Sequence, residues 1–216
     1  MSSGSWLGHG DGTIGTTPDH MGAWEKLQLG WLDCEVARAG TKSTHKLGPS
    51  YHATKKTQAV IGELPKDSAG NGRYYLAENR QYLGYDATLE TGPYKLGWPL
   101  TSPDRVEHFP YQNGLSVNYW NTALGGTVAR NRIQTFDATF GLERTDPISL
   151  HRETEQGMTT LGVPSRPAVP VFDDIDPNAY YDAANPMGSV KVAGVGVSIK
   201  VVQSNKTGKM TVKVNG

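Results

Sequence analysis

Cysteine is almost absent from this chain: Cys34 is the only one among 216 residues. An internal disulfide is therefore excluded. No histidine lies near Cys34 in the sequence, so a thiol-protease site is not indicated, and we expect the side chain to pack as a small, half-buried hydrophobic group. Apolar residues are also scarce, at 37%, whereas glycine and proline number 26 and 13. This balance favours an all-β body in which short strands are joined by many turns.

The chain also lacks an excess of charge of either sign. Its 21 basic and 21 acidic residues cancel, and no basic patch or acidic tail stands out in the sequence. We therefore expect neither nucleic acid nor an anionic membrane surface as a partner. No stretch approaches the ~18 apolar residues that a membrane span requires. The first residues, Met1–Trp6, lack the basic and apolar regions of a signal peptide.

The motifs of several enzyme classes are missing too. No two of the six histidines stand four apart with a glutamate between them, so the sequence has no H-E-x-x-H zinc helix. It has no C-x-x-C and no G-x-S-x-G nucleophile turn either. We expect the histidines to be surface or turn residues, and we expect no zinc ligand and no catalytic residue in this chain.

What the sequence does contain is a strand-and-turn rhythm. Strands are predicted over residues 57–61, 73–78, 114–120 and 147–150. Alternating apolar residues from Ser189 to Val201 and from Met210 to Val214, with a turn at 204–208, predict a β-hairpin. The regular spacing favours a sandwich of antiparallel sheets. Residues 86–113 and 151–188 are rich in proline, and we expect long irregular segments there.

One helix is predicted, over residues 20–29. Asp19 is a suitable N-cap, Met21, Trp24 and Leu27 lie at helical spacing, and Gly30 is a natural stop.

An acidic cluster is the best candidate for an ion site. Asp173, Asp174 and Asp176 lie close together beside Pro177. Carboxylates gathered in a loop suit a hard cation such as calcium, which takes six or more oxygen ligands. A solvated turn explains the same residues, because aspartate and proline are ordinary turn residues.

Several phrases resemble the immune inhibitor A family of secreted bacterial zinc metalloproteases. They occur in one order along most of the chain, and Gly22–Asp33 is the most specific of them. The phrases are Met1–Trp6 (MSSGSW), Gly12–Thr16 (GTIGT), Gly22–Asp33 (GAWEKLQLGWLD), Tyr75–Gln81 (YLAENRQ), Gly84–Asp86 (GYD), His108–Trp120 (HFPYQNGLSVNYW), Gln134–Leu142 (QTFDATFGL) and Pro170–Asp174 (PVFDD).

The resemblance implies a zinc endopeptidase with two histidine ligands, a glutamate base and a third, acidic ligand. The metal would lower the pKa of an attacking water. All of these residues would lie before the Met-turn, the tight turn beneath the zinc, and Met1 resembles that turn. The chain is thus similar to the C-terminal part of such a protease, without its zinc-binding helix. Only about a dozen residues separate Trp120 from Arg132, where the family has a longer insertion.

We therefore expect a mainly β fold: a C-terminal remnant of a zincin catalytic domain with one helix, residues 1–34, followed by an antiparallel β-sandwich, residues 35–216. The first ~30 residues should pack poorly, because the rest of the catalytic half, the expected partner, is missing. The full-length protein would be secreted and would cleave protein or peptide substrates, and this chain alone would be inactive.

A second hypothesis is a non-catalytic binding module for carbohydrate or a cell surface. It requires Trp98 or Trp120 to be exposed on one face of the sandwich. A purely structural domain is a third, and the sequence does not separate it from the second.

Overall fold

The computed structural model describes residues 20–51, 56–81, 83–87, 114–124, 148–150, 171–179, 183, 191–205 and 207–216. Strands dominate these ranges. The helices are α1 (Ala23–Gln28) and the short 3-10 helices η2 (Gly84–Ala87) and η3 (Thr122–Leu124). The strands are β1 (Cys34–Ala37), β2 (Lys42–Leu47), β3 (Ala59–Glu63), β4 (Arg73–Arg80), β5 (Gly114–Asn121), β6 (Ile148–Leu150), β7 (Val171–Asp173), β8 (Ser198–Ser204) and β9 (Met210–Asn215).

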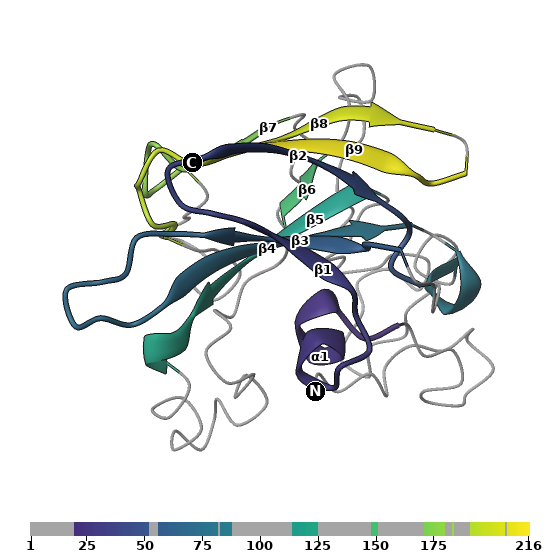
Figure 1. Ribbon diagram of the computed structural model, residues 1–216, viewed down its shortest axis with the longest axis horizontal. Coiled ribbons are helices and arrows are strands. Elements are labelled where there is room, and N and C mark those ends of the chain that lie inside the picture. The colour runs from purple at the N-terminus through teal and green to yellow at the C-terminus, as the bar shows by residue number, and fades with distance from the viewer. Residues whose placement is uncertain are drawn as a thin grey trace, which may run out of the picture.

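These strands form two sheets that lie one above the other (Figure 1). The five-stranded sheet has the order β1-β3-β4-β5-β6, and the four-stranded sheet has the order β2-β9-β8-β7. Six of the seven strand pairings that the structure describes are antiparallel, and β1 pairs with β3 in parallel. The predicted mainly β class with one helix is confirmed. The pairing of β1 with β3 is the exception to the expected antiparallel arrangement, because the chain leaves the sheet for β2 and returns in the same direction.

The main hydrophobic core lies between the two sheets. Alternate residues of facing strands point into it, as the period of two in a β-strand requires. Burial of so many aliphatic and aromatic side chains is the main force that holds the layers together. Its members include Tyr75, Ala77, Leu115 and Val117 from the five-stranded sheet, and Phe172, Ile199, Val201, Met210, Val212 and Val214 from the four-stranded sheet.

Helix α1 covers the opposite face of the five-stranded sheet (Figure 1). A second cluster forms there from Ala23, Trp24 and Leu32 on one side and Ala59 and Leu76 on the other. Strand β4 is therefore buried on both faces. The expectation that the first ~30 residues pack poorly is wrong for the described part of that segment, because the helix has a core in common with the sheet.

The helix is shorter than predicted. Its N-cap is Gly22, which makes no side-chain capping bond, and Asp19 lies outside the described residues. The predicted stop is confirmed, since Gly30 has φ +71°, in the left-handed region that glycine adopts at little cost. Neither α1 nor any other helix in the described ranges has the length and apolar character that crossing a membrane demands.

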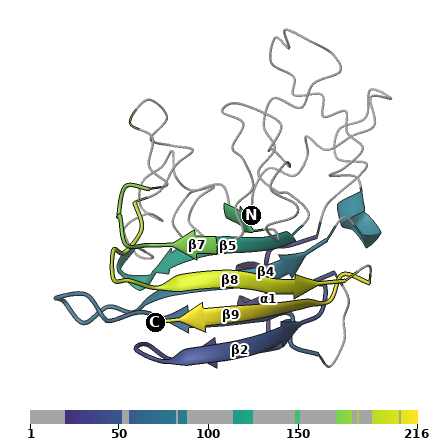
Figure 2. The same ribbon diagram turned by 90° about the horizontal axis from the view of Figure 1, so that it is seen from above.

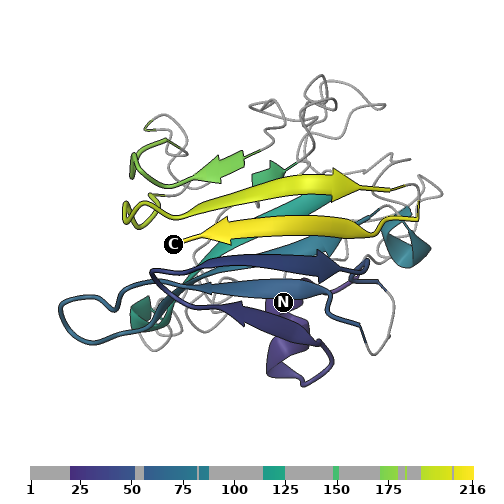
Figure 3. The ribbon, with the colours of Figure 1, turned by 45° about the horizontal axis from the view of Figure 1, so that its top comes forward.

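The C-terminal hairpin is confirmed, but its first strand begins later than predicted. The turn uses the Asn205 side-chain oxygen, which accepts hydrogen bonds from the backbone of Thr207 and Lys209. Residues 191–197 are not a strand, although their valines alternate. Gly194 and Gly196 have φ of +68° and +84°, which breaks the extended backbone that a strand needs. Figure 3 shows β8 and β9 side by side, with β2 next to β9.

Candidate functional site

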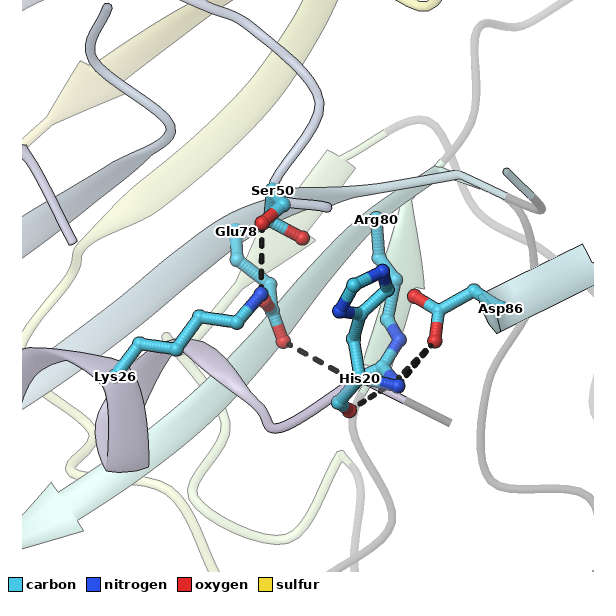
Figure 4. Close-up of polar contacts among 6 residues, drawn as sticks. All are labelled: His20, Lys26, Ser50, Glu78, Arg80 and Asp86. Atoms are coloured by element: carbon cyan, nitrogen blue, oxygen red, sulfur yellow. Dashed lines mark hydrogen bonds and ion pairs between the residues drawn. The ribbon is translucent and has the colours of Figure 1, made fainter. Parts of the chain in front are cut away.

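A group of buried charged side chains lies between α1 and the five-stranded sheet (Figure 4). Along β4, Tyr75 and Ala77 point into the core between the sheets, so Glu78 and Arg80 point to the helix side. Their exposed fractions are 1% each. Lysine, glutamate and arginine are rarely buried to this extent unless they are paired, so the group needs an explanation.

Arg80 is the centre of this buried charge cluster. Its Nη2 atom donates to the backbone oxygen of His20 at 2.7 Å and to Oδ1 of Asp86, on η2, at 3.0 Å. Its Nη1 atom lies 3.7 Å from Oε1 of Glu78. The backbone N–H of His20 also donates to Asp86 Oδ1, at 2.8 Å. One guanidinium thus joins the segment before α1, strand β4 and η2.

Lys26 joins the cluster from the helix. Its exposed fraction is 8%, and its Nζ atom donates to the backbone oxygen of Ser50 at 2.7 Å. The Ser50 N–H in turn donates to the carbonyl of Asn79, on β4. The helix, the connection after β2 and the sheet are therefore linked through one ammonium group.

Desolvation controls the ionisation of the cluster. Burial raises the pKa of the Glu78 carboxyl above its ordinary value, and the nearby Arg80 and Lys26 cations oppose this shift only in part. Burial likewise lowers the pKa of Lys26, and the charge of Glu78 opposes that change. The pKa of His20 is lowered, again mainly by burial. Each charged group is therefore held at a cost, which its partners reduce.

The cluster fixes an orientation and does not form an open site. Glu78 Oε2 and Asp86 Oδ2 are buried and have no hydrogen-bond partner within the described structure. Side chains this enclosed cannot reach a peptide substrate. Because a buried charge without its partner is costly, the cluster makes one placement of α1 on β4 much better than any other.

No motif in the sequence points directly to this cluster. Glu78 and Arg80 lie within the phrase Tyr75–Gln81, which was noted only as part of the family resemblance. One pattern does point to them: the predicted strand runs into three consecutive polar residues, Glu78, Asn79 and Arg80, and not into the alternation that is typical of a strand with one solvated face.

The acidic cluster 173–176 does not act as one group. Asp174 is fully buried. Its Oδ2 accepts from the Tyr75 hydroxyl at 2.7 Å and from the Val195 N–H at 3.3 Å, and its Oδ1 accepts from the Val197 N–H at 2.6 Å. Asp174 therefore binds the irregular segment before β8. Gly194 and Gly196 take this segment out of the extended conformation, so the N–H groups of Val195 and Val197 bond to Asp174 and not to a neighbouring strand. Burial and the bond to Asp174 also raise the pKa of the Tyr75 phenol.

The other two aspartates make local turn contacts. Asp173 Oδ1 accepts from the Ile175 N–H at 2.8 Å, and Asp176 Oδ1 accepts from the Asn178 N–H at 2.9 Å. In the ranges that the structure describes, no group of three or more His, Cys, Asp or Glu side chains is placed to hold a metal ion. Calcium at Asp173, Asp174 and Asp176 stays a prediction.

Zinc does not fit the histidines that the structure describes. His45 was expected at the surface, but it is buried in β2 with an exposed fraction of 5%. Its Nδ1 contacts Glu35 Oε2 at 2.5 Å and its Nε2 contacts Ser43 Oγ at 2.7 Å, so both ring nitrogens are engaged. His20 lies beside the buried charge cluster, away from His45. Met1, the residue that resembles the Met-turn, lies outside the described residues.

Two further expectations can be compared with the structure. Cys34 is a free, half-buried thiol packed against the cluster under α1, as predicted, and burial raises its pKa. Trp120 is half-buried, and its ring lies edge-on to Trp24 with the centroids 6.2 Å apart. It also lies against Tyr74. Trp98 is outside the described residues.

Comparison with known protein families gives a match in the C-terminal part of the chain. Residues 122–213 match a family model described as the VEG domain of immune inhibitor A-like metallopeptidases. The match covers less than half of the chain and extends from η3 through most of β9, so it includes all of the four-stranded sheet except β2. No curated protein matches the chain. The match supports the resemblance found in the sequence motifs, which relates this chain to the immune inhibitor A-like metallopeptidases.

Proposed function

We propose that this chain is a non-catalytic part of a secreted zinc metalloendopeptidase and that it does not hydrolyse peptides alone. The observation that carries the proposal is the match of residues 122–213 to a domain of immune inhibitor A-like metallopeptidases. The sequence contains no H-E-x-x-H motif, so the residues that would bind zinc belong to another part of the enzyme. That part would also provide the protein or peptide substrate site.

Helix α1 is the element through which the β-sheets would hold the catalytic part. In the sequence it resembles the helix that ends the catalytic domain, which places the predicted boundary after residue 34. The buried charge cluster supports this role, because Arg80 and Lys26 fix the helix on the sheet by bonds that a small displacement would break. The β-sheets would then set the position of the catalytic part.

Apolar side chains around α1 offer a surface for that contact. Met21, Leu29, Trp31 and Val36 have exposed fractions of 40%, 49%, 65% and 51%. Half of the large exposed hydrophobic residues of the described structure thus lie between residues 21 and 36. Exposed apolar groups of this kind mark interaction sites. We assign this surface to the catalytic domain of the metallopeptidase.

A binding and activity experiment tests the proposal. The purified chain is assayed on a fluorogenic protein substrate with zinc, and it is titrated with an immune inhibitor A-like catalytic domain made as a separate chain. We expect no hydrolysis by the chain alone, and a complex that Trp31→Ala weakens at least about tenfold, because central aromatic residues dominate interface energies. Ile175→Ala, which removes an equally exposed apolar side chain far along the sequence, should leave the affinity unchanged.

Two results would overturn the proposal. One is hydrolysis by the chain alone that a chelator abolishes. The other is the absence of a complex with the catalytic domain, or a complex that Trp31→Ala and Ile175→Ala weaken equally.

The alternative of a carbohydrate-binding module that uses exposed tryptophan has little support from Trp120. That ring packs beneath α1 against Trp24, so it offers no open platform to a sugar. A binding function would need another surface.

A further inference from the structure

The positive and negative charges that cancel in the sequence are unevenly distributed over the structure. Strands β2, β8 and β9 contain lysines and no aspartate or glutamate, and Asp173 on β7 is the acidic residue of the four-stranded sheet. The side of this sheet that faces away from the core is seen from outside in Figure 2. No basic patch stands out along the sequence, because the neutral total hides this one-sided distribution of lysines on the four-stranded sheet.

The lysines stand in neighbouring rows across the strands. One row is Lys46, Thr211 and Gln203, and the next is Thr44, Lys213 and Lys200. Along β2 the two outward lysines, Lys42 and Lys46, are four residues apart, about 13 Å in a strand. All four lysines of these strands are exposed. We call them, with Lys56 and Lys209 beside them, the lysine face.

One pair on this face is unfavourable for folding. Lys200 and Lys213 are direct cross-strand partners, and like charges directly opposite each other destabilise a sheet. Within the described part of the chain, none of the six lysine ammonium groups has an ion pair or a hydrogen bond. The repulsion between these lysines does not stabilise the fold. We therefore interpret the positive charge of this surface as serving the binding of a partner.

A pocket of about 530 Å³ opens at one end of the lysine face. Three lysines line it, together with polar amide and hydroxyl side chains: Lys46, Lys56, Lys209, Thr57, Gln203, Asn205 and Thr211. One carboxylate stands nearby, Glu35, but its two oxygens are taken by His45 and Thr57. The pocket therefore offers ammonium groups for an anion and neutral donors and acceptors for hydroxyl groups.

We propose that the lysine face binds a linear acidic polysaccharide, with one acidic sugar seated in the pocket and further acidic groups along the rows of lysines. Lysine acts as a point charge that accepts an anion from many directions. The threonine, asparagine and glutamine side chains between the lysines suit a hydroxyl-rich chain. Charge complementarity is what selects this occupant.

Two other anionic partners fit the face less well. Proteins that bind single-stranded nucleic acids stack the bases on aromatic side chains, and proteins that read base edges commonly use arginine. Strands β2, β8 and β9 contain no Phe, Trp, Tyr or Arg. A membrane surface favours basic residues together with bulky apolar groups that enter the lipid. Val202, which is 41% exposed, is the large apolar side chain that β2, β8 and β9 expose, and the side chains that stand with the lysines in the two rows are threonine and glutamine.

The test is a titration of the full chain with a size-defined heparin oligosaccharide, followed by calorimetry, with dextran as the neutral polymer. We expect binding to heparin that rising salt weakens, and none to dextran. Lys46→Gln and Lys213→Gln should each weaken binding about two- to fivefold, the range of an exposed charge pair. Lys66→Gln removes the same charge from the exposed β3–β4 connection and should leave the affinity unchanged.

Stability supplies an independent readout. Lys200→Gln should weaken heparin binding, yet leave Tm unchanged or raise it, because it relieves the repulsion with Lys213. Equal losses for Lys66→Gln and Lys46→Gln would overturn the proposal, as would tighter binding to duplex DNA or to phosphatidylserine vesicles than to heparin. Binding does not require a catalytic domain, so its failure would leave the proposed peptidase role intact.

Discussion

At the scale of single residues, Asp174 is a fully buried side chain with several contacts to lose. It accepts hydrogen bonds from the Tyr75 hydroxyl and from the N–H groups of Val195 and Val197. In Asp174→Asn an amide NH₂ must face one set of these donors, and we expect a loss of about 1–3 kcal/mol in the free energy of unfolding. Denaturant unfolding followed by tryptophan fluorescence measures it.

Asp176→Asn is the matched control for this substitution. Asp176 is exposed and makes one turn contact, so the change should stay within about 0.5 kcal/mol. The same samples test the calcium prediction. If calcium raises the Tm of the unmodified chain and Asp176→Asn abolishes that rise, the aspartates bind the ion. A structural role for Asp174 alone predicts no response to calcium.

Glu78 gives a prediction about pH. Its pKa is raised in the folded chain, so the folded state holds its proton more tightly than the unfolded state does. Its contribution to stability is complete below the unfolded pKa, near 4.5, and declines as pH rises through the folded value. Glu78→Gln cannot ionise, so its Tm relative to the unmodified chain should improve between acidic and neutral pH. If the Tm of Glu78→Gln instead falls further below that of the unmodified chain as pH rises, the ion pairs of Glu78 stabilise the fold by more than its burial costs.

At the scale of elements, the docking of α1 depends on Trp24. Its ring is 5% exposed and packs on Trp120. Trp24→Ala should cost about 3–5 kcal/mol and should speed hydrogen exchange in Ala23–Gln28 more than in β8 and β9. Trp31→Ala, at an exposed tryptophan seven residues on, should change neither. Uniform acceleration throughout the chain would mean that α1 and the sheets unfold together.

The strands that the sequence predicted are those with apolar alternation or β-branched runs, such as β4, β5 and β9. Strands β1 and β2 were not predicted, because β1 has only four residues with no apolar alternation and five of the six residues of β2 are polar, so no apolar period of two is visible. The predicted strand before Ser198 failed for a different reason: two glycines in the left-handed region turn the backbone toward Asp174. That contact joins residues far apart in sequence, which local patterns cannot show.

The candidate site was predicted even less completely. The acidic residues 173–176 were identified by type, but their burial differs, and only the fold separates the buried Asp174 from the half-buried Asp173 and the exposed Asp176. The buried charge cluster and the lysine face arise because distant segments come together. Net charge is a sum along the chain, and it has no information about which strands lie side by side.

At the scale of the whole molecule, the helix and the sheets behave as one unit. A chain of residues 35–216 would expose Ala59 and Leu76 and would leave Glu78 and Arg80 without Lys26 and the His20 backbone. We expect it to fold with a Tm lower by roughly 10 °C, because both sheets and the core between them remain. Calorimetry and binding of a hydrophobic dye measure the change. An unchanged Tm would show that the predicted boundary after residue 34 separates independent units.

The position of β9 has a consequence for how the protein is made. β2 joins its sheet through β9 alone, although more than 160 residues separate the two strands in sequence. A ribosome that has released β1 to β8 has therefore produced a nascent chain in which β2 has no partner. Assembly must wait for the last strand to emerge, and closing so long a loop makes that step slow. A stop codon before residue 210 would accordingly remove β9, which lies between β2 and β8, and would separate β2 from the rest of its sheet.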